Sequence, residues 1–221
     1  MKIAALIPVK GFANAKQRLS AQLSSAERAL LAETMMRDVV AEAAAARGFD
    51  GVYVVTGNEY VAKIAAALGA RVILEAGENG ETGAVEFALA ELKRRDVDAA
   101  LVVPADMPLV RATDFEQVIG AAPSAAPFAL LVPSHDRMGT NALLLAPPDI
   151  IRLRFGYDSF TYHISQVAGG GAPLTVIENE RIALDIDEPQ DLERFVAAGG
   201  GPGATYARLM EMRTAAPGTG A

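Results

Sequence analysis

The sequence predicts an α/β protein with three layers (α/β/α), in which helices cover both faces of a mainly parallel mixed sheet. Short apolar runs with strand character alternate along the chain with helical segments of about ten residues or more. Such helices act as crossovers between neighbouring strands, which makes most strand pairs parallel and places helices on both faces. The first run, Ile3–Val9, is apolar throughout, as expected of a strand that is buried on both faces.

The first half of the chain is a regular alternation of helices and strands. After the first strand comes a polar loop with several cations, residues 10–20. Ser24 and Glu27 then have the spacing of a capping box, and they open an alanine-rich helix that continues to about Ala46. The later elements are a strand over 51–55, a helix over 59–68, a strand over 71–74, a glycine-rich loop over 77–83, a helix over 84–95 and a strand over 99–103.

The second half is less regular. Residues 204–213 could form a helix, and residues 215–221 are expected to be a frayed tail. We therefore predict one domain over residues 1–198, followed by a partly flexible tail rich in Gly, Pro and Ala over 199–221. The other expected elements are strands over 128–132, 142–145, 174–177 and 182–184, helices over 159–168 and 188–198, and a short helix opened by Pro147 and Pro148.

Composition excludes several classes of function. The chain has 221 residues and no cysteine, so it forms no disulfide, thiolate metal site or cysteine nucleophile. Its formal net charge of −7 argues against a general nucleic-acid-binding protein. No apolar run approaches the roughly 18 residues of a membrane span, and the first apolar stretch is too short for a signal peptide, so the cytoplasm is the expected compartment. A G-x-S-x-G motif for a serine nucleophile is also absent from the sequence.

The loop after the first strand is a candidate phosphate-binding site. It carries Lys10, Lys16 and Arg18, and it lies between a strand and a helix. Ligands of parallel α/β sheets bind at the carboxyl ends of the strands, where free backbone N–H groups and fixed cations can hold phosphate oxygens. The loop lacks the spacing of a Walker A motif. A solvated basic loop is the alternative interpretation.

Three aspartates form a candidate metal site. Asp106 directly follows an apolar strand and lies between Pro104 and Pro108. Asp185 and Asp187 are two residues apart, so in a strand they would point to the same side. Like charges this close need a cation, and carboxylate oxygens suit Mg²⁺. The alternatives are that Asp106 caps a helix or a turn, and that Asp187 caps the next helix while Asp185 faces solvent.

Two further segments could bind an anion. The hydroxyl of Thr140 lies in a polar turn that leads into a strand, where nearby N–H groups could help it to hold a phosphate or a carboxylate. Gly156 permits a close approach of the backbone, and Ser159 is expected to be the N-cap of the next helix, whose N-terminus would attract an anion. His163 is interpreted as structural or substrate-contacting rather than as a metal ligand. Turn chemistry with core aromatics is the alternative for both segments.

These segments together resemble one family of enzymes. The run from Pro8 to Leu19 and the run Asp106-Met107-Pro108-Leu109 resemble nucleotidyltransferases with a glycosyltransferase-A-like fold. Within that group, three other segments resemble the guanylyltransferases of deazaflavin-coenzyme (coenzyme F-420) biosynthesis, which act on 2-phospho-L-lactate, phosphoenolpyruvate or 3-phospho-D-glycerate. The resemblance covers residues 1 to about 198, which would be the nucleotidyltransferase domain. The three segments are Gly139-Thr140-Asn141-Ala142-Leu143, Phe155-Gly156 with Ser159-Phe160 and His163, and the run from Leu184 to Leu192.

The resemblance implies a magnesium-dependent transfer of GMP from GTP to a phosphorylated three-carbon acid, with release of pyrophosphate. No general base is needed, because the attacking phosphate oxygen is already ionised and catalysis is mostly positioning and charge stabilisation. Lys16, Arg18 and Asp106 would act in catalysis. The implied binding residues are Pro8, Lys10, Lys16 and Arg18 for the GTP phosphates, Asp106, Asp185 and Asp187 for Mg²⁺, and Thr140, Gly156 and Ser159 for the phospho-acid.

Several points stay open at the level of sequence. The alternative functions are another nucleotidyltransferase of the same fold, of molybdenum-cofactor or sugar-phosphate type, and a non-catalytic nucleotide-binding module. Where many family members have a Gly-Leu-Asn run, this chain has Gly80-Glu81-Thr82-Gly83-Ala84, which leaves the preference for guanine and the choice of acid open. Candidate partners are GTP, a phospho-carboxylate and a downstream transferase that accepts the GMP-capped product; nucleic acid and membranes are not expected, and a homodimer stays open.

Overall fold

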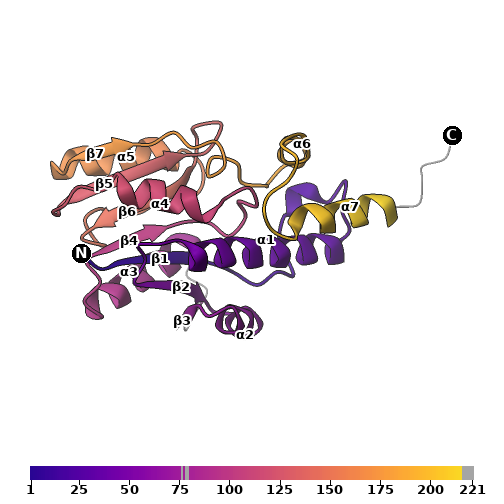
Figure 1. Ribbon diagram of the computed structural model, residues 1–221, viewed down its shortest axis with the longest axis horizontal. Coiled ribbons are helices and arrows are strands. Elements are labelled where there is room, and N and C mark those ends of the chain that lie inside the picture. Colours follow the sequence, from indigo (N-terminus) through magenta and orange to yellow (C-terminus); the bar gives the residue numbers. More distant parts are fainter. Residues whose placement is uncertain (76, 78–79, 216–221) are drawn as a thin grey trace.

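A computed structural model describes residues 1–75, 77 and 80–215. Within these residues, seven strands form a single sheet (Figure 1). The strands are β1 (Ile3–Pro8), β2 (Gly51–Thr56), β3 (Arg71–Leu74), β4 (Ala99–Val102), β5 (Phe128–Pro133), β6 (Thr140–Ala146) and β7 (Leu174–Val176). Their spatial order is β3-β2-β1-β4-β6-β5-β7, so the chain crosses over between β3 and β4 and adds the later strands on the far side of β4.

The sheet is mixed and mainly parallel, as predicted. β1 runs parallel to β2 and to β4, β2 runs parallel to β3, and β5 runs parallel to β7. In contrast, β6 runs antiparallel to both of its neighbours, β4 and β5. The amino end of β6 therefore lies at the edge where β1 and β4 have their carboxyl ends. This direction brings Thr140 to the edge at which α/β sheets bind ligands.

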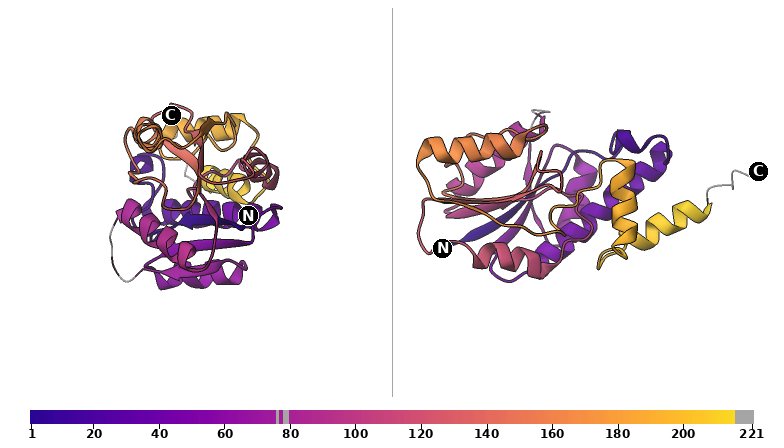
Figure 2. Two further views of the ribbon diagram at one scale, coloured as in Figure 1. Left: turned by 90° about the vertical axis from the view of Figure 1, so that its left-hand side faces the viewer. Right: turned by 90° about the horizontal axis from the view of Figure 1, so that it is seen from above.

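Helices cover both faces of the sheet, which confirms the three-layer prediction (Figure 2). One face carries α1 (Ser25–Ala45), α2 (Glu59–Ala67) and α4 (Ala112–Gly120). The other face carries α3 (Gly80–Arg94) and α5 (Ser159–Gly170). None of the helices in the described part of the chain is both long and apolar enough to cross a membrane.

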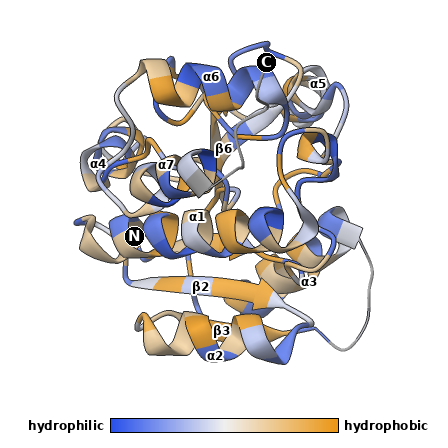
Figure 3. Ribbon diagram, turned by 90° about the vertical axis from the view of Figure 1, so that its right-hand side faces the viewer, coloured by the Kyte–Doolittle hydropathy of each residue, from blue (hydrophilic) through white to orange (hydrophobic). Residues whose placement is uncertain are grey.

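The core follows the alternation of side chains along the strands. In β1, Ile3, Ala5 and Ile7 pack toward α1, α2 and α4. Ala4 and Leu6, which alternate with them, pack toward α3 and α5. All five side chains are buried, as the continuous apolar run predicted. Figure 3 shows the neighbouring strand β2 in mainly hydrophobic colours between helices that carry hydrophilic residues.

Two helices lie beyond the sheet. α6 (Pro189–Ala197) and α7 (Thr205–Ala215) lie beside the half of α1 that projects past the carboxyl ends of the strands (Figure 1). Leu31 of α1, Phe195 of α6 and Leu209 of α7 share a separate buried cluster. This cluster also contains Ile186, so it lies directly behind the segment that carries two of the candidate metal ligands.

Most predicted elements are present within a few residues of their predicted limits. Ser24 and Glu27 form the predicted capping box, in which the carboxylate of Glu27 accepts the N–H of Ser24 at 2.8 Å. The helix predicted over 204–213 is α7. The largest shift is in α3, which begins at Gly80 rather than near residue 84, so the predicted glycine-rich loop over 77–83 ends inside the helix. Residues 78 and 79 of that loop lie outside the described residues, as do residues 216–221 of the predicted frayed tail.

Two predicted elements are absent from the described structure. No helix begins at Pro147 and Pro148: residues 147–151 form turns and bends, in which the N–H of Ile150 donates to the carbonyl of Pro147 at 3.1 Å. Residues 182–184, predicted as a strand, form no ladder, because the N–H of Ala183 donates back to the carbonyl of Asn179 at 2.9 Å. Local turn bonds thus satisfy the backbone groups that a helix or a strand would have used.

Two elements were not predicted. A short 3₁₀ helix, η1 (Gln17–Leu19), lies inside the basic loop. α4 is the larger omission. It begins after Arg111, a residue that gives little signal for a helix start, and Asp114 accepts the N–H of Arg111 at 2.8 Å in its place. This cap depends on a long-range environment, since Asp114 is almost wholly buried.

The segment between α6 and α7 is held against α1 by Asp38. The carboxylate of Asp38 accepts the backbone N–H groups of Ala204 and Thr205, each at 2.9 Å, and the hydroxyl of Thr205 at 2.6 Å. It therefore caps α7 from another helix. Glycine is required beside it, because a Cβ on Gly203 would lie 2.0 Å from Cγ of Asp38. A Cβ on Gly201 would lie 1.8 Å from the carbonyl oxygen of Pro108.

We expect Gly203→Ala to lower the free energy of unfolding by about 1–3 kcal/mol, because the added methyl group must displace Asp38 or the backbone. Urea unfolding of the full chain measures this difference. Gly169→Ala is a matched control, since nothing lies within 4 Å of a Cβ there, and this change within α5 should stabilise by about 0.5–1 kcal/mol. Equal stability of the two variants would show that the close approach to Asp38 is not needed.

Candidate functional site

Lys16 lies at the centre of a charged cluster at the carboxyl ends of the strands. Its Nζ lies 2.5 Å from Oδ2 of Asp106 and 2.8 Å from Oδ1 of Asp187. Its side chain is only 8% exposed, and its backbone is in the left-handed region, with φ 51°. Burial alone would lower the pKa of the Lys16 ammonium, but Asp106 and then Asp187 outweigh it and raise this pKa above its usual 10.5. Lys16 is therefore a fixed cation.

A backbone hydrogen bond joins the two acidic segments. The N–H of Ile186 donates to the carbonyl of Asp106 at 3.0 Å, so the loop after β4 runs beside residues 184–187. Leu184 and Ile186 are buried in the cluster under α6, whereas Asp185 and Asp187 alternate with them and are half-buried. The predicted period of two is therefore present, although the segment is not a strand.

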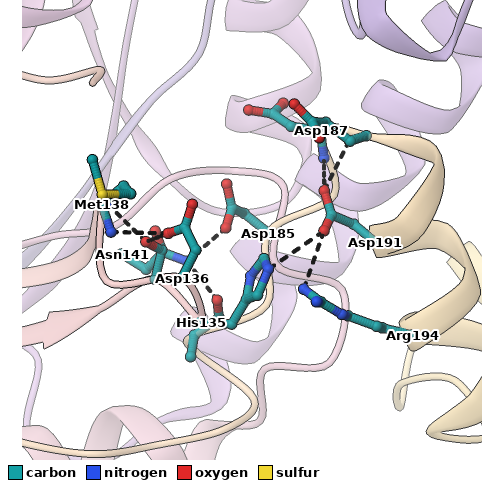
Figure 4. Close-up of polar contacts among 12 residues, drawn as sticks. His135, Asp136, Met138, Asn141, Asp185, Asp187, Asp191 and Arg194 are labelled. Atoms are coloured by element: carbon teal, nitrogen blue, oxygen red, sulfur yellow. Dashed lines mark hydrogen bonds and ion pairs between the residues drawn. The ribbon is translucent and has the colours of Figure 1, made fainter. Parts of the chain in front are cut away.

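Asn141 holds Asp185. The amide nitrogen of Asn141 donates to Oδ1 of Asp185 at 2.9 Å, and it also lies 3.0 Å from the carbonyl of Ile182 (Figure 4). Burial, and next the negative charge of Asp106, raise the pKa of Asp185 to about 6, while the bond from Asn141 works in the opposite direction. This carboxyl group therefore lies where negative charge accumulates.

Two buried carboxylates that were not predicted anchor residues 184–187, which we call the acidic segment. Asp114 of α4 accepts two bonds from the guanidinium of Arg181, at 2.8 Å from Nε and 2.5 Å from Nη2. Asp191 of α6 accepts the N–H groups of Asp187 and Glu188, at 3.1 and 2.8 Å (Figure 4). The cap of α6 is thus Glu188 with Asp191, and the side chain of Asp187 is free to bind Lys16 instead of capping the helix.

The chemistry of this cluster fits a hard cation. Oδ1 of Asp106 is buried and has no hydrogen-bond partner in the part of the chain that the structure describes. An uncompensated buried carboxylate oxygen is costly unless a cation or water reaches it. Among the described residues, however, no group of three or more acidic or histidine side chains is already arranged around one point. Lys16 lies between Asp106 and Asp187, so the cluster offers at most one or two carboxylates to a metal.

The other predicted cations lie further out. Lys10 is exposed, and its charge acts on Glu81 of α3. Arg18 forms an exposed pair with Glu188, with a distance of 3.3 Å between Nη1 and Oε1. Pro8 ends β1 beside Val55 of β2, so it marks where the basic loop leaves the sheet. The structure therefore brings Lys16, and not Arg18, to Asp106.

A second polar group lies where β6 meets α5. The backbone N–H of Thr140 donates to Oγ of Ser159 at 3.1 Å, and Oγ1 of Thr140 lies 3.0 Å from Nδ1 of His163. The N–H of Ser159 donates to the carbonyl of Gly156, at 3.2 Å, and Gly156 has a φ of 98° that favours glycine. The predicted role of Ser159 as N-cap is wrong. Asp158 occupies that position, and Ser159 is the first helical residue, whose hydroxyl accepts from β6 instead.

The first two residues of β6 connect the two polar groups. Thr140 contacts α5 on one side, and Asn141 contacts the acidic segment on the other. Adjacent residues of a strand point to opposite sides, so one short stretch serves both groups. Sequence reasoning singled out Thr140 but not Asn141, although the amide next to the threonine was a signal for it. Glu81 was also missed, and burial and then the charge of Asp106 raise its pKa.

Comparisons with known proteins agree with this arrangement. A family model described as "Guanylyl transferase CofC like" matches residues 3–215. The chain is 36% identical to a phosphoenolpyruvate guanylyltransferase of Sphaerobacter thermophilus over 195 residues, and this alignment covers 88% of this chain and 93% of that protein. It is 35% identical to a 2-phospho-L-lactate guanylyltransferase of Methanothermobacter thermautotrophicus, over 94% of this chain and 89% of that protein.

A third relative carries another substrate name. The chain is 34% identical to a 3-phospho-D-glycerate guanylyltransferase of Colwellia psychrerythraea, over 87% of this chain and 90% of that protein. Among solved structures, a protein described as a nucleotide-diphospho-sugar transferase from Desulfovibrio desulfuricans G20 matches 97% of this chain and 98% of its own, with a TM-score of 0.78 and 17% identity. A 4-diphosphocytidyl-2C-methyl-D-erythritol synthase matches 87% and 95%, with a TM-score of 0.59 and 20% identity. These structures show that the fold is that of nucleotidyltransferases.

Proposed function

Because the chain belongs to the CofC-like guanylyl transferase family, we propose that it couples GTP to a phosphorylated three-carbon acid and releases pyrophosphate. The chain is a guanylyltransferase, and its relatives are named for three-carbon acids that differ in the third carbon and in the place of the phosphate. One observation carries the assignment of the site. β6 lies between two groups: a buried cation with carboxylates, one oxygen of which has no partner among the described residues, and two buried hydroxyls. A phosphate and a small acid need these two kinds of group side by side.

The reaction proposed is a single displacement at phosphorus. A phosphate oxygen of the acid forms a bond to the α-phosphorus of GTP, and the bond from that phosphorus to the bridging oxygen of the β-phosphate breaks. Pyrophosphate leaves with the electron pair of that bond, and the product is the acid capped with GMP. Negative charge moves toward the leaving group, so fixed positive charge beside it lowers the barrier.

Lys16 is proposed as the main catalytic cation. Its ammonium is buried and held by two carboxylates, so it is already oriented before the nucleotide arrives. Lys10 and Arg18, which are exposed near the mouth of the site, are proposed to bind the triphosphate, together with the backbone after Pro8. The pair between Arg18 and Glu188 is a surface pair, so turning Arg18 toward phosphate would cost about 1 kcal/mol or less.

Asp106, Asp185 and Asp187 are the proposed Mg²⁺ ligands, of which one or two at a time would bind the ion directly. The orphaned oxygen of Asp106 and the accumulated charge around Asp185 support this proposal. Mg²⁺ usually binds one or two carboxylates and completes its shell with water and substrate phosphates, so a complete protein cage is not needed. When bound, the ion would neutralise the charge of the phosphates.

The hydroxyls of Thr140 and Ser159, with the backbone at Gly156, are proposed to bind the phospho-acid. Both residues are buried, and the backbone N–H of Thr140 donates to the hydroxyl oxygen of Ser159. The capped product would then pass to a transferase of deazaflavin-coenzyme biosynthesis, in the cytoplasm. Residues 1–198 remain our proposed nucleotidyltransferase domain, and the cap that Asp38 gives to α7 attaches part of the following segment to it.

Release of pyrophosphate tests this proposal. The purified full chain is incubated with Mg²⁺, one nucleotide triphosphate and one acid, in all combinations of GTP, CTP and UTP with phosphoenolpyruvate, 2-phospho-L-lactate and 3-phospho-D-glycerate. We expect release with GTP and one of the acids, and none when the acid or Mg²⁺ is omitted. Release with CTP or UTP but not with GTP would favour the activity of another nucleotidyltransferase of the same fold. Binding of GTP without release under any combination would favour a binding module.

A further inference from the structure

His163 is a buried histidine that has no role in the proposed reaction. It lies in α5, it is 0% exposed, and its ring contacts the rings of Phe155 and Tyr162 edge to face. Here both nitrogens have specific partners, and the two partners come from different segments of the chain.

These partners determine which nitrogen carries the proton. The backbone N–H of Arg154 points to Nε2 at 3.3 Å. A backbone amide can only donate, so Nε2 must accept and has no hydrogen. A neutral imidazole has one N–H, which is then on Nδ1 and donates to Oγ1 of Thr140 at 3.0 Å.

The ring is neutral at ordinary pH. Burial, and next the positive charge of Arg154, lower the pKa of His163 from 6.5 to about 4. The carboxylates of the acidic segment do not contact the ring, and the groups on it are Thr140, the amide of Arg154 and the two aromatic rings. A single neutral tautomer of His163 is therefore expected at pH values well above 4.

The tautomer determines how the neighbouring hydroxyl is used. Because Oγ1 of Thr140 accepts from His163, its own proton points elsewhere. Oγ of Ser159 likewise accepts, from the N–H of Thr140, and its proton is also left over. Within the described residues, neither hydroxyl proton has an acceptor among the hydrogen bonds of the protein. Two buried O–H donors without an acceptor would suit an anionic group.

We infer that His163 is a positioning residue, which holds the hydroxyl of Thr140 as a donor toward an anionic oxygen of the acid substrate. This inference rests on the proposed function for the identity of the ligand, but the chain of bonds itself does not. The order is Arg154 N–H to Nε2, Nδ1–H to Thr140, and Thr140 O–H to the carboxylate or phosphate of the acid. The other tautomer would turn Thr140 into a donor toward the ring and remove it from the ligand.

Two amide substitutions separate the two halves of this chain of bonds. In His163→Asn, the amide nitrogen can take the place of Nδ1 and still donate to Thr140, while the contact with Arg154 is lost. In His163→Gln, the amide oxygen can take the place of Nε2 and accept from Arg154, while the donor to Thr140 is lost. Both variants remove the same ring from the same core, so they should lose similar stability in thermal unfolding.

The KM for the acid distinguishes the variants. We expect the KM of His163→Asn for the acid to stay within about threefold of the parent value. His163→Gln should raise this KM by roughly 10-fold or more, because in that variant Thr140 is no longer held as a donor to a charged group. The KM for GTP should change in neither variant. Thr140→Val, which lacks the hydroxyl, should match His163→Gln. Equal effects of Asn and Gln on the acid, or an effect on GTP, would overturn the inference.

A spectroscopic readout decides the tautomer without any activity. In ¹⁵N-labelled full chain, proton–nitrogen correlation spectra distinguish a protonated ring nitrogen from a bare one, and the signals lost in His163→Asn identify His163 beside the other histidine, His135. We expect a proton on Nδ1 and a bare Nε2. The opposite pattern refutes the inference even if the enzyme is active. If no acid supports pyrophosphate release, the proposed function fails, and the spectrum together with calorimetric binding of each acid to the variants still decides this inference.

Discussion

Asp106→Asn is expected to lower kcat by at least about 10³-fold, which corresponds to the loss of about 4 kcal/mol of transition-state stabilisation. Asparagine has the same shape, but it lacks the charge with which Asp106 holds Lys16 and would hold a metal. The variant should also need far more Mg²⁺ for its residual activity. Initial rates of pyrophosphate release over a series of Mg²⁺ concentrations measure both effects.

The fold should tolerate this change. Asp106 and Asp187 flank Lys16, and both of their negative charges also act on Asp185, so the removal of the charge on Asp106 relieves repulsion on Asp185. Thermal unfolding should therefore stay close to that of the parent. Asp96→Asn is the matched control, because Asp96 is exposed and has a φ of 57°, a conformation that asparagine adopts easily. Near-normal turnover of Asp106→Asn would remove Asp106 from the metal site.

Lys16→Ala is expected to lower kcat by about 10²–10³-fold, since a fixed charge beside the phosphates is worth about 3–4 kcal/mol. The ammonium is buried between Asp106 and Asp187, so solvent cannot replace it with a mobile cation of the same placement. Unlike Asp106→Asn, this change leaves Asp106 and Asp187 without the cation that they share. We therefore expect a loss of stability as well, and more Mg²⁺ should partly reverse that loss.

Two comparisons make the test of Lys16 specific. Lys63→Ala removes an exposed lysine from α2 and should change neither kcat nor stability. The double variant of Lys16→Ala with Asp106→Asn should lose much less transition-state stabilisation than the sum of the losses in the two single variants, because the two groups act as a pair. An unchanged rate in Lys16→Ala would mean that the loop is simply a solvated basic loop. Additive losses would mean that the two side chains act separately.

Local patterns in the sequence were sufficient to predict the layers of the fold. Periodicity and capping residues identified β1 and α1, because the apolar run of β1 and the Ser24–Glu27 cap of α1 are local features of the sequence. α4 was missed because its cap, Asp114, is ordered by Arg181 from much later in the chain. A partner so distant in the sequence leaves no local signal.

For the candidate site, the sequence predicted residues that partly lie together in the structure, but it did not predict their geometry. The resemblance pointed to Lys16, Asp106 and Asp187, which the structure brings within hydrogen-bond distance. It could not tell that Lys16 would lie between the carboxylates, or that Arg18 would turn to Glu188 instead. Serine is a common N-cap residue, but the hydroxyl of Ser159 accepts the backbone N–H of Thr140 instead. Only the antiparallel direction of β6 brings that N–H near Ser159.

The cap of α7 by Asp38 has a consequence for the order in which the molecule is completed. Asp38 and Thr205 are separated by 167 positions, so a chain leaving the ribosome can make this contact only after every strand of the sheet has emerged. Contacts between such distant residues form slowly, because a long loop must first close. Gly201 in the same segment lies against the carbonyl of Pro108, two residues after Asp106. The loop that carries the proposed metal ligand therefore reaches its final packing late in synthesis.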